Sequence, residues 1–122
     1  MPNHIVVQNL RKADLTKKRV EKIEKAIESA VREIPEVRID SEDLSFTFLH
    51  DPTVKSEERP IMIEAKLLCS KSLKDAVWLK NSAAMNIAQD FCKTVGKWRK
   101  LSKVKVKVDV CLRSQNEGYY VV

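Results

Sequence analysis

Apolar and polar residues alternate along three segments of the chain, and a fourth segment is a short apolar run rich in β-branched residues. Successive side chains of a β-strand point to opposite faces of a sheet, so this pattern predicts strands. The expected strands cover residues 4–10, 43–49, 60–70 and 103–112. The last one alternates most regularly, with valines at 104, 106, 108 and 110 separated by polar residues.

Two other segments repeat apolar residues every three or four positions, which is the spacing of one face of an α-helix. The first covers residues 15–34, with Asp14 as the expected N-cap and Pro35 as the limit, and its apolar face is Val20, Ile23, Ile27, Val31 and Ile34. The second is expected to begin at a capping box from Ser72 to Asp75 and to end between Gly96 and Leu101. Its expected apolar face is Val77, Ala84, Ile87, Phe91, Val95 and Trp98.

The order of these elements is β-α-β-β-α-β. It predicts an α+β fold, a two-layer sandwich in which two helices cover one face of a four-stranded sheet. The 122 residues contain no internal linker, so a single domain over residues 1–122 is expected. The uncovered face of the sheet is expected to be polar, because it receives Ser45, Thr47, Glu64, Lys66, Lys105, Lys107 and Asp109.

Three interpretations of this polar face are open: a solvated surface, an RNA-binding sheet, or the lining of a solvated channel in an oligomer. Base stacking on a sheet needs exposed aromatic side chains, and the phenylalanines of the second strand, Phe46 and Phe48, lie in the opposite phase. The pattern therefore favours the first and third interpretations.

The formal charge of +6 adds a second possible link to nucleic acid. Basic residues follow one another from Lys93 to Lys107 without an acidic residue between them, and such a run could contact phosphates. A solvated helix end and strand face would give the same pattern, and lysines at a helix C-terminus also suit the helix dipole.

Other classes are excluded by composition and motif. No apolar run is long enough for a membrane helix, so no membrane partner is expected. The three cysteines show neither a paired spacing nor a metal motif, which predicts free thiols, largely buried, in a reducing cytoplasm. Phosphate-loop and dinucleotide motifs are absent as well, so no cofactor is expected.

Pro2 directly precedes the first strand and becomes the N-terminus if Met1 is removed. A free N-terminal proline is a secondary amine. Apolar surroundings and nearby cations lower the pKa of an amine, which brings it into the range of a useful general base. Proline after the initiator methionine also occurs without any catalytic reason, so Pro2 gains weight only together with the fold.

Pro2, the β-α-β-β-α-β order and the turn from Asn116 to Tyr119 together resemble the tautomerase superfamily. Its members include 4-oxalocrotonate tautomerase, 5-carboxymethyl-2-hydroxymuconate isomerase and macrophage migration inhibitory factor. The resemblance covers nearly the whole chain in element order. It implies that the Pro2 amine moves a proton next to a carbonyl, a keto-enol tautomerisation of a small anionic carbonyl compound that bears a carboxylate. It also implies a homotrimer with sites between subunits and sheets around a solvent channel.

The resemblance further implies residues that hold the substrate. Arg11 matches the position of a substrate-binding arginine after the first strand. A second basic residue is expected between the first helix and the second strand, where Arg38 is the nearest candidate and Ser45 the alternative occupant of the aligned place. Lys66 and Tyr119 are further candidates. The competing hypotheses are a non-enzymatic binding module that contacts nucleic acid through the basic run, and a tautomerase fold without activity.

Overall fold

The computed structural model describes residues 3–37, 44–50, 60–99 and 104–114. Its helices and strands follow the predicted order β-α-β-β-α-β. The strands are β1 (Asn3–Gln8), β2 (Leu44–Leu49), β3 (Ile61–Cys69) and β4 (Val106–Ser114), and the helices are α1 (Lys17–Arg32) and α2 (Val77–Val95). Two short 3-10 turns, η1 (Lys12–Leu15) and η2 (Lys71–Leu73), precede the two helices.

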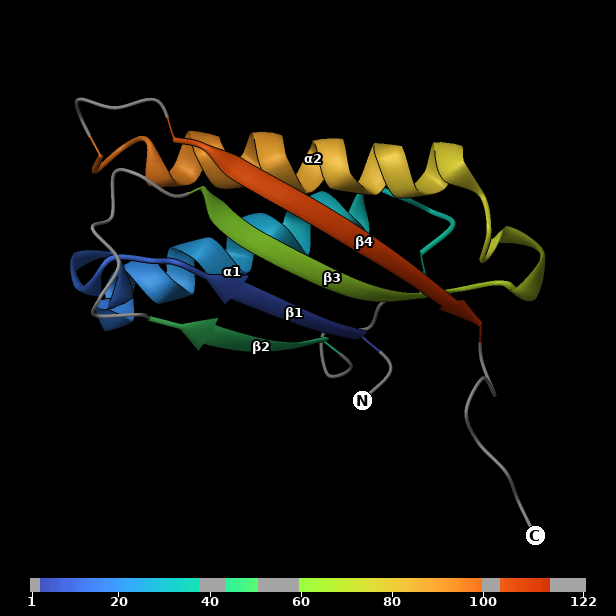
Figure 1. The fold of residues 1–122 in the computed structure, drawn as a ribbon, viewed down its shortest axis with the longest axis horizontal. Helices are drawn as coiled ribbons and strands as arrows, with labels where there is room; N and C mark the ends of the chain where they lie inside the picture. Colours follow the sequence, from blue (N-terminus) through green and yellow to red (C-terminus); the bar gives the residue numbers. More distant parts are fainter. Residues whose placement is uncertain (1–2, 38–43, 51–59, 100–103, 115–122) are drawn as a thin grey trace, which may run out of the picture.

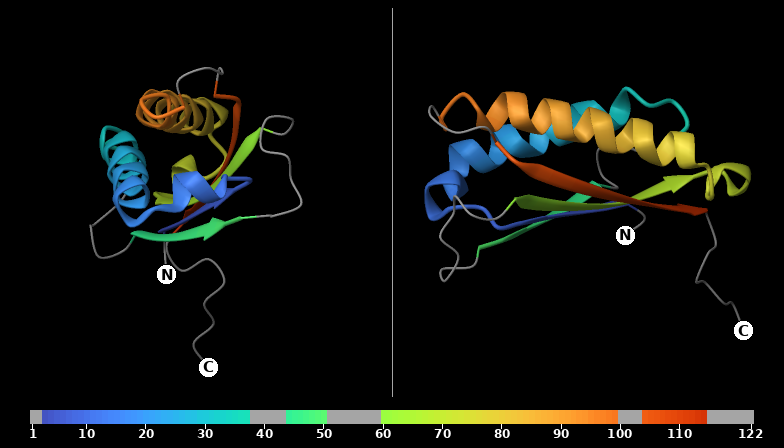
Figure 2. Two further views of the ribbon diagram at one scale, coloured as in Figure 1. Left: turned by 90° about the vertical axis from the view of Figure 1, so that its left-hand side faces the viewer. Right: turned by 45° about the horizontal axis from the view of Figure 1, so that its top comes forward.

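The strands form one sheet in the order β2-β1-β3-β4 (Figure 1). Within each half the two strands are neighbours and run parallel, β1 with β2 and β3 with β4. Neither pair is therefore a hairpin, and a helix connects the two strands of each pair. The two halves meet where β1 pairs with β3 in the antiparallel direction. Both helices lie on the same face of the sheet, as Figure 2 shows, so the predicted two-layer α+β architecture is confirmed.

The core fills the space between this helix layer and the sheet. β1 and β3 are the central strands, and their inward side chains Ile5, Val7, Ile61, Ile63, Ala65 and Leu67 are at most 1% exposed. From α1, the predicted residues Ile23, Ile27 and Val31 are fully buried. Phe46 and Phe48 on the edge strand β2 are half-buried, and their rings stack with centroids 6.0 Å apart against the margin of the core.

The start of α2 differs from the prediction. Ser72 lies in η2 rather than at a helix N-cap, and α2 begins five residues later, after Ala76, which makes no side-chain cap. The buried face is therefore Leu79, Ala83, Ile87, Phe91 and Val95, each four residues from the next. Val77 is 66% exposed, so its expected place in the apolar face was wrong. A helix that begins at residue 77 points this side chain away from the sheet.

The N-cap expected for α1 was also wrong. Thr16 is the N-cap, and its hydroxyl accepts the backbone N–H of Arg19 at 3.3 Å. Asp14 lies two residues earlier, in η1, and is completely buried. This buried acid is central to the candidate site.

The face of the sheet opposite the helices is mainly polar, as predicted, although Val6, Leu49, Met62 and Leu68 also lie on it. It carries Ser45 and Thr47 from β2, and it carries the exposed side chains Glu64, Lys66, Lys107 and Asp109 from β3 and β4. Among the described strand residues on this face, no Phe, Tyr or Trp is found, and the imidazole of His4 is the one aromatic ring. The described strands therefore lack the group of aromatic rings on which two or three bases stack in sheet-type RNA binding.

Candidate functional site

The beginning of β1, next to Pro2 in the sequence, is fixed by side-chain hydrogen bonds. Asn3 is completely buried, and its side-chain oxygen accepts the backbone N–H of Leu68 at 2.7 Å. The hydroxyl of Ser45 donates to the backbone carbonyl of Asn3 at 3.4 Å. The chain therefore leaves β1 toward its N-terminus from a firmly held position.

His4 follows on the open face of the sheet and binds two hydroxyl groups of β2. Its Nδ1 lies 2.5 Å from the Ser45 hydroxyl and its Nε2 lies 3.1 Å from the Thr47 hydroxyl. The direction of both bonds depends on which ring nitrogen of His4 carries the proton. The hydroxyl of Ser45, the alternative occupant of the place aligned with a basic residue, is thus engaged within the chain.

Lys66 lies beside His4 on the neighbouring strand. The two residues are register partners in the β1–β3 pair, and the Lys66 side chain is exposed on the open face. Of the predicted binding residues that the structure describes, Lys66 is the one beside the N-terminal end of β1.

Arg11 lies beyond the other end of β1. Asn9 turns the chain there with a positive φ of 67°, a conformation that asparagine tolerates better than most residues. Its side-chain nitrogen donates to the Pro60 carbonyl at 3.1 Å, which ties this turn to the start of β3. Nearby, Nδ1 of His50 donates to the Leu10 carbonyl at 2.8 Å. Arg11 then starts the 3-10 turn η1.

Asp14, in the same turn, accepts hydrogen bonds from η1 and from the segment after α2. Its carboxylate accepts the Arg11 backbone N–H at 2.9 Å and the Trp98 indole N–H at 2.8 Å. Arg99 donates through Nε at 3.2 Å and also through Nη2. Nη2 of Arg11 makes a longer contact of 3.5 Å. We call these four residues, Arg11, Asp14, Trp98 and Arg99, the Asp14 cluster.

These donors determine the charge of Asp14. Burial alone would raise the pKa of the carboxyl group, but the hydrogen bonds from Arg99, Trp98 and Arg11 outweigh it and lower the pKa from 3.8 to about 2. Asp14 is therefore ionised at neutral pH. Arg19 adds to the order of the cluster, since its guanidinium lies 5.1 Å from the ring centroid of Trp98 and donates to the Ala13 carbonyl at 2.8 Å.

The remaining predicted site residues, Pro2, Arg38 and Tyr119, lie outside the described residues. The two that are described, Arg11 and Lys66, are not brought together within one chain. Lys66 lies beside the first residues of β1, and Arg11 follows its last residue. A strand of this length spans about 20 Å. A small substrate cannot touch both ends at once.

The basic run does not form one surface over its described part. Lys93 and Lys97 are exposed on and just after α2, in the helix layer, whereas Lys107 is exposed on the open face of the sheet. Arg99 is turned inward to Asp14. A single phosphate-binding stripe is therefore not assembled from these residues.

The cysteines are free but not uniformly buried. Cys69 is buried, Cys92 half-buried and Cys111 exposed, so the expectation of buried thiols was wrong for Cys111, which takes the polar phase of β4. Burial raises the pKa of the Cys92 thiol. In the described part of the chain, no three His, Cys, Asp or Glu side chains gather as a metal site. None of the described helices has the length and apolar character needed to cross a membrane.

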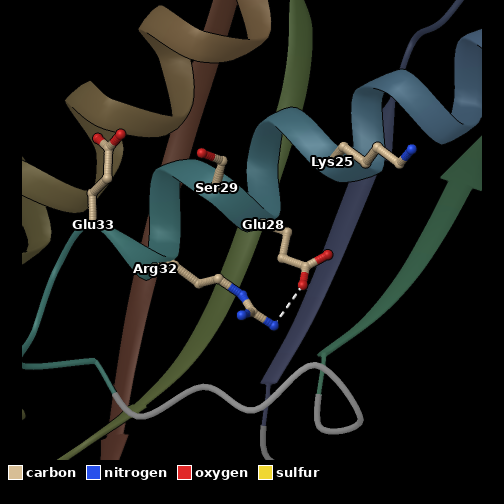
Figure 3. Close-up of a pocket in the computed structure, with 5 residues that line it drawn as sticks. All are labelled: Lys25, Glu28, Ser29, Arg32 and Glu33. Atoms are coloured by element: carbon tan, nitrogen blue, oxygen red, sulfur yellow. Dashed lines mark ion pairs between the residues drawn. The ribbon is translucent and has the colours of Figure 1, made fainter.

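A shallow hollow on the outer side of α1 lies away from these groups (Figure 3). Its lining residues are Lys25, Glu28, Ser29, Arg32 and Glu33. Arg32 and Glu28 form a partly exposed ion pair of 2.7 Å there. Such a pair on a solvated helix face contributes little to stability. The hollow contains none of the predicted site residues.

Sequence reasoning missed the role of Asp14, Trp98 and Arg99. An acid three residues after Arg11 was the available local signal, because this spacing brings the two side chains together in a turn. The partnership with Trp98, 84 positions along the chain, has no local signal. It depends on how the segment after α2 lies against η1.

Similar proteins are found by comparison of structures and not by comparison of sequences. No protein-family model matches the sequence, and no curated protein matches it. Among solved structures, a fused 4-OT described as a wild-type symmetric trimer has a TM-score of 0.59 at 13% identity, over 94% of this chain and 87% of that chain. MIF2 from Leishmania major has a TM-score of 0.58 at 11% identity, over 97% and 92% of the two chains.

A third neighbour is named for a different activity. It is the malonate semialdehyde decarboxylase FG41, inhibited by 3-bromopropiolate, with a TM-score of 0.57 at 10% identity over 100% of this chain and 90% of that chain. At such identities the likeness concerns the fold alone. The predicted resemblance is confirmed at that level: the chain has the fold of the tautomerase superfamily.

Proposed function

We propose that this protein is a tautomerase-type isomerase in which Pro2, freed by removal of Met1, is the general base. The observation that carries the proposal is the fold, shared with several tautomerase-superfamily structures over nearly the whole chain. The fixed start of β1 supports it, because a catalytic N-terminus has to leave the sheet from a defined position.

The Pro2 amine takes a proton from a carbon or enol oxygen next to the substrate carbonyl and returns it elsewhere on the molecule. Cationic side chains hold the substrate carboxylate and stabilise the developing enolate charge. We assign this binding role to Arg11, with Lys66, Arg38 and Tyr119 as further candidates.

The separation of Arg11 from the Pro2 end of β1 favours a site between subunits. About 20 Å of strand lies between these groups in one chain, which exceeds the size of a small carbonyl compound. In a homotrimer, Arg11 of one chain could approach the N-terminus of the next. The polar open face of the sheet would then line a solvated channel.

The first test is the intact mass of the purified protein, which is expected to lack Met1. A retained Met1 makes the Pro2 nitrogen an amide and removes the base. The second test is phenylpyruvate tautomerisation. Pro2→Ala is expected to lower kcat by about 10²–10⁴-fold, the usual contribution of a general base. Pro35→Ala, the same change at an exposed site after α1, is the matched control.

A second outcome would favour the competing hypothesis. Salt-sensitive nucleic-acid binding that is lost on charge reversal of Lys105 and Lys107, in a protein without tautomerase activity, would indicate a binding module. The split of the described basic residues between two layers argues against that result.

A further inference from the structure

Two arginines share the buried carboxylate of Asp14, and they share it unequally. Arg99 donates two hydrogen bonds, and its side chain is only 8% exposed. The Arg11 guanidinium makes one long contact of 3.5 Å, and its side chain is 30% exposed. The negative charge of Asp14 is therefore balanced mainly by Arg99.

The Arg11 guanidinium therefore retains positive charge and hydrogen-bond donors that can bind another partner. Arg11, Asp14 and Arg99 carry a net charge of about +1 together, because the carboxyl group is ionised. Nε of Arg11 is buried and has no acceptor among the described residues. A buried donor without an acceptor is uncommon in native proteins, so the partners within the chain do not saturate the Arg11 guanidinium. A bound carboxylate would reach the exposed part of this side chain, which is 30% exposed.

The backbone of Arg11 is held more firmly than its side chain. Its N–H donates to Asp14 at 2.9 Å, while Trp98 holds the other carboxylate oxygen at 2.8 Å. Asp14 is completely buried, so it cannot turn away to solvent. The carboxylate thus fixes where Arg11 begins and limits where its guanidinium can point.

We propose that Asp14 and Arg99 are positioning residues for Arg11: Asp14 orients its guanidinium, and Arg99 neutralises Asp14 so that Arg11 remains free to bind a substrate carboxylate. The inference rests on the proposed function in taking Arg11 as the substrate-binding residue. The inference adds that Arg99, in the segment after α2, controls the affinity of Arg11 for the substrate carboxylate. Arg99 need not touch the substrate to do this.

This division of roles predicts a non-additive result. Without Arg99, the Asp14 carboxylate would be paired with Arg11 alone. It would then compete with a substrate carboxylate for the Arg11 guanidinium. Removing the charge of Asp14 as well would end that competition. A purely structural cluster would show the same relief in the free energy of unfolding, because the double variant no longer buries an unpaired carboxylate, but it would leave the Kd of the folded variants unchanged.

The experiment measures phenylpyruvate binding through the ¹⁵N–¹H signal of Arg11 Nε, which requires no turnover. Arg99→Gln is expected to raise Kd about tenfold, as for the loss of a charge-assisted contact, and Asp14→Asn about threefold. The double variant should bind within about threefold of Asp14→Asn and more tightly than Arg99→Gln. In turnover assays, KM should follow Kd while kcat changes little.

Arg32→Gln is the matched control, because it removes the same charge from the exposed pair with Glu28 (Figure 3). It should leave Kd unchanged. Arg99→Lys keeps a cation beside Asp14 and should retain affinity within about threefold, even if Arg99→Gln fails to fold.

Two results would overturn the inference: a double variant that binds no better than Arg99→Gln, or an Arg11 signal that does not respond to phenylpyruvate. If Arg99→Gln does not fold, the test is made with Arg99→Lys. The inference is then overturned if folded Arg99→Lys loses as much affinity for phenylpyruvate as Arg11→Gln does. Failure of the proposed catalysis is seen separately, as unchanged turnover in Pro2→Ala while the Arg11 signal still responds.

Discussion

The indole N–H of Trp98 donates a 2.8 Å hydrogen bond to the carboxylate of Asp14 across 84 positions of the sequence. This bond joins the segment after α2 to the turn before α1. It lies on the same side of the fold as Arg11, which shares the carboxylate. The two βαβ-type halves of the chain are therefore connected at this point by polar contacts as well as by the common sheet.

Trp98→Phe is expected to destabilise the protein by about 2 kcal/mol, because it removes a hydrogen bond to a buried charged acceptor. Urea unfolding at neutral pH measures the change. Trp78→Phe is the matched control, since Trp78 is 53% exposed on α2 and its replacement should cost less than about 0.5 kcal/mol. Equal losses in the two variants would contradict the role assigned to Trp98.

The pKa of Asp14 predicts a specific response to acid. A group whose pKa is lower in the folded state stabilises the fold above its unfolded pKa, and this contribution disappears as pH falls through the folded value. For Asp14 it amounts to about 2 kcal/mol, fully present above pH 3.8 and lost as pH falls toward about 2.

Urea unfolding of wild type and Asp14→Asn at pH 6 and pH 2.5 tests this response. Wild type should be the more stable protein at pH 6, and the gap should narrow on acidification. Other carboxyl groups titrate in both proteins and cancel in the comparison. A gap that stays constant with pH would show that the Asp14 charge is not what the cluster stabilises.

The sequence predicted the fold because its strand and helix signals are local. Alternation identified β4, and the three- and four-residue spacing identified the buried face of α1, including Ile23 and Ile27. The start of α2 was harder, since Ser72 to Asp75 has the composition of a capping box but forms the 3-10 turn η2. Tertiary packing selected residue 77 as the start of α2 instead.

The candidate site was predictable only in part. Arg11 was identified through the family resemblance and lies just after β1, and its role in substrate binding stays a prediction. Its partners Trp98 and Arg99 come from the opposite end of the sequence, and no periodicity or motif links them to Asp14. Long-range polar contacts of this kind depend on packing geometry, which sequence spacing does not encode.

The corrected face of α2 gives a third prediction. Leu79 is completely buried between α2 and the sheet, so Leu79→Ala should cost about 2–5 kcal/mol through lost contacts and a residual cavity. Val77→Ala removes two methyl groups from a side chain that is 66% exposed and should change stability by less than about 0.5 kcal/mol. Thermal unfolding of both variants gives the comparison. A larger loss at residue 77 than at residue 79 would restore the original assignment of the face.

The three cysteines predict an order of chemical reactivity. Thiolates are the reactive form, so access and pKa together decide how fast each residue is alkylated. Cys111 is exposed on the open face of the sheet and should react first with iodoacetamide. Cys92 is half-buried with a raised pKa and should react more slowly, and Cys69, 1% exposed, should react only on unfolding. Peptide mass spectrometry over a time course at pH 8 separates the three.

Cys111→Ser is the control, because it should remove the fast phase and leave the slow phases unchanged. The same measurement reports on the open face in the assembled protein. A small reagent reaches Cys111 if that face is solvated or lines a water-filled channel, the two arrangements favoured by its polar side chains. If Cys111 reacts as slowly as Cys69 in the native protein, that face is instead packed dry against another chain, and the solvated channel in the proposed homotrimer would have to be abandoned.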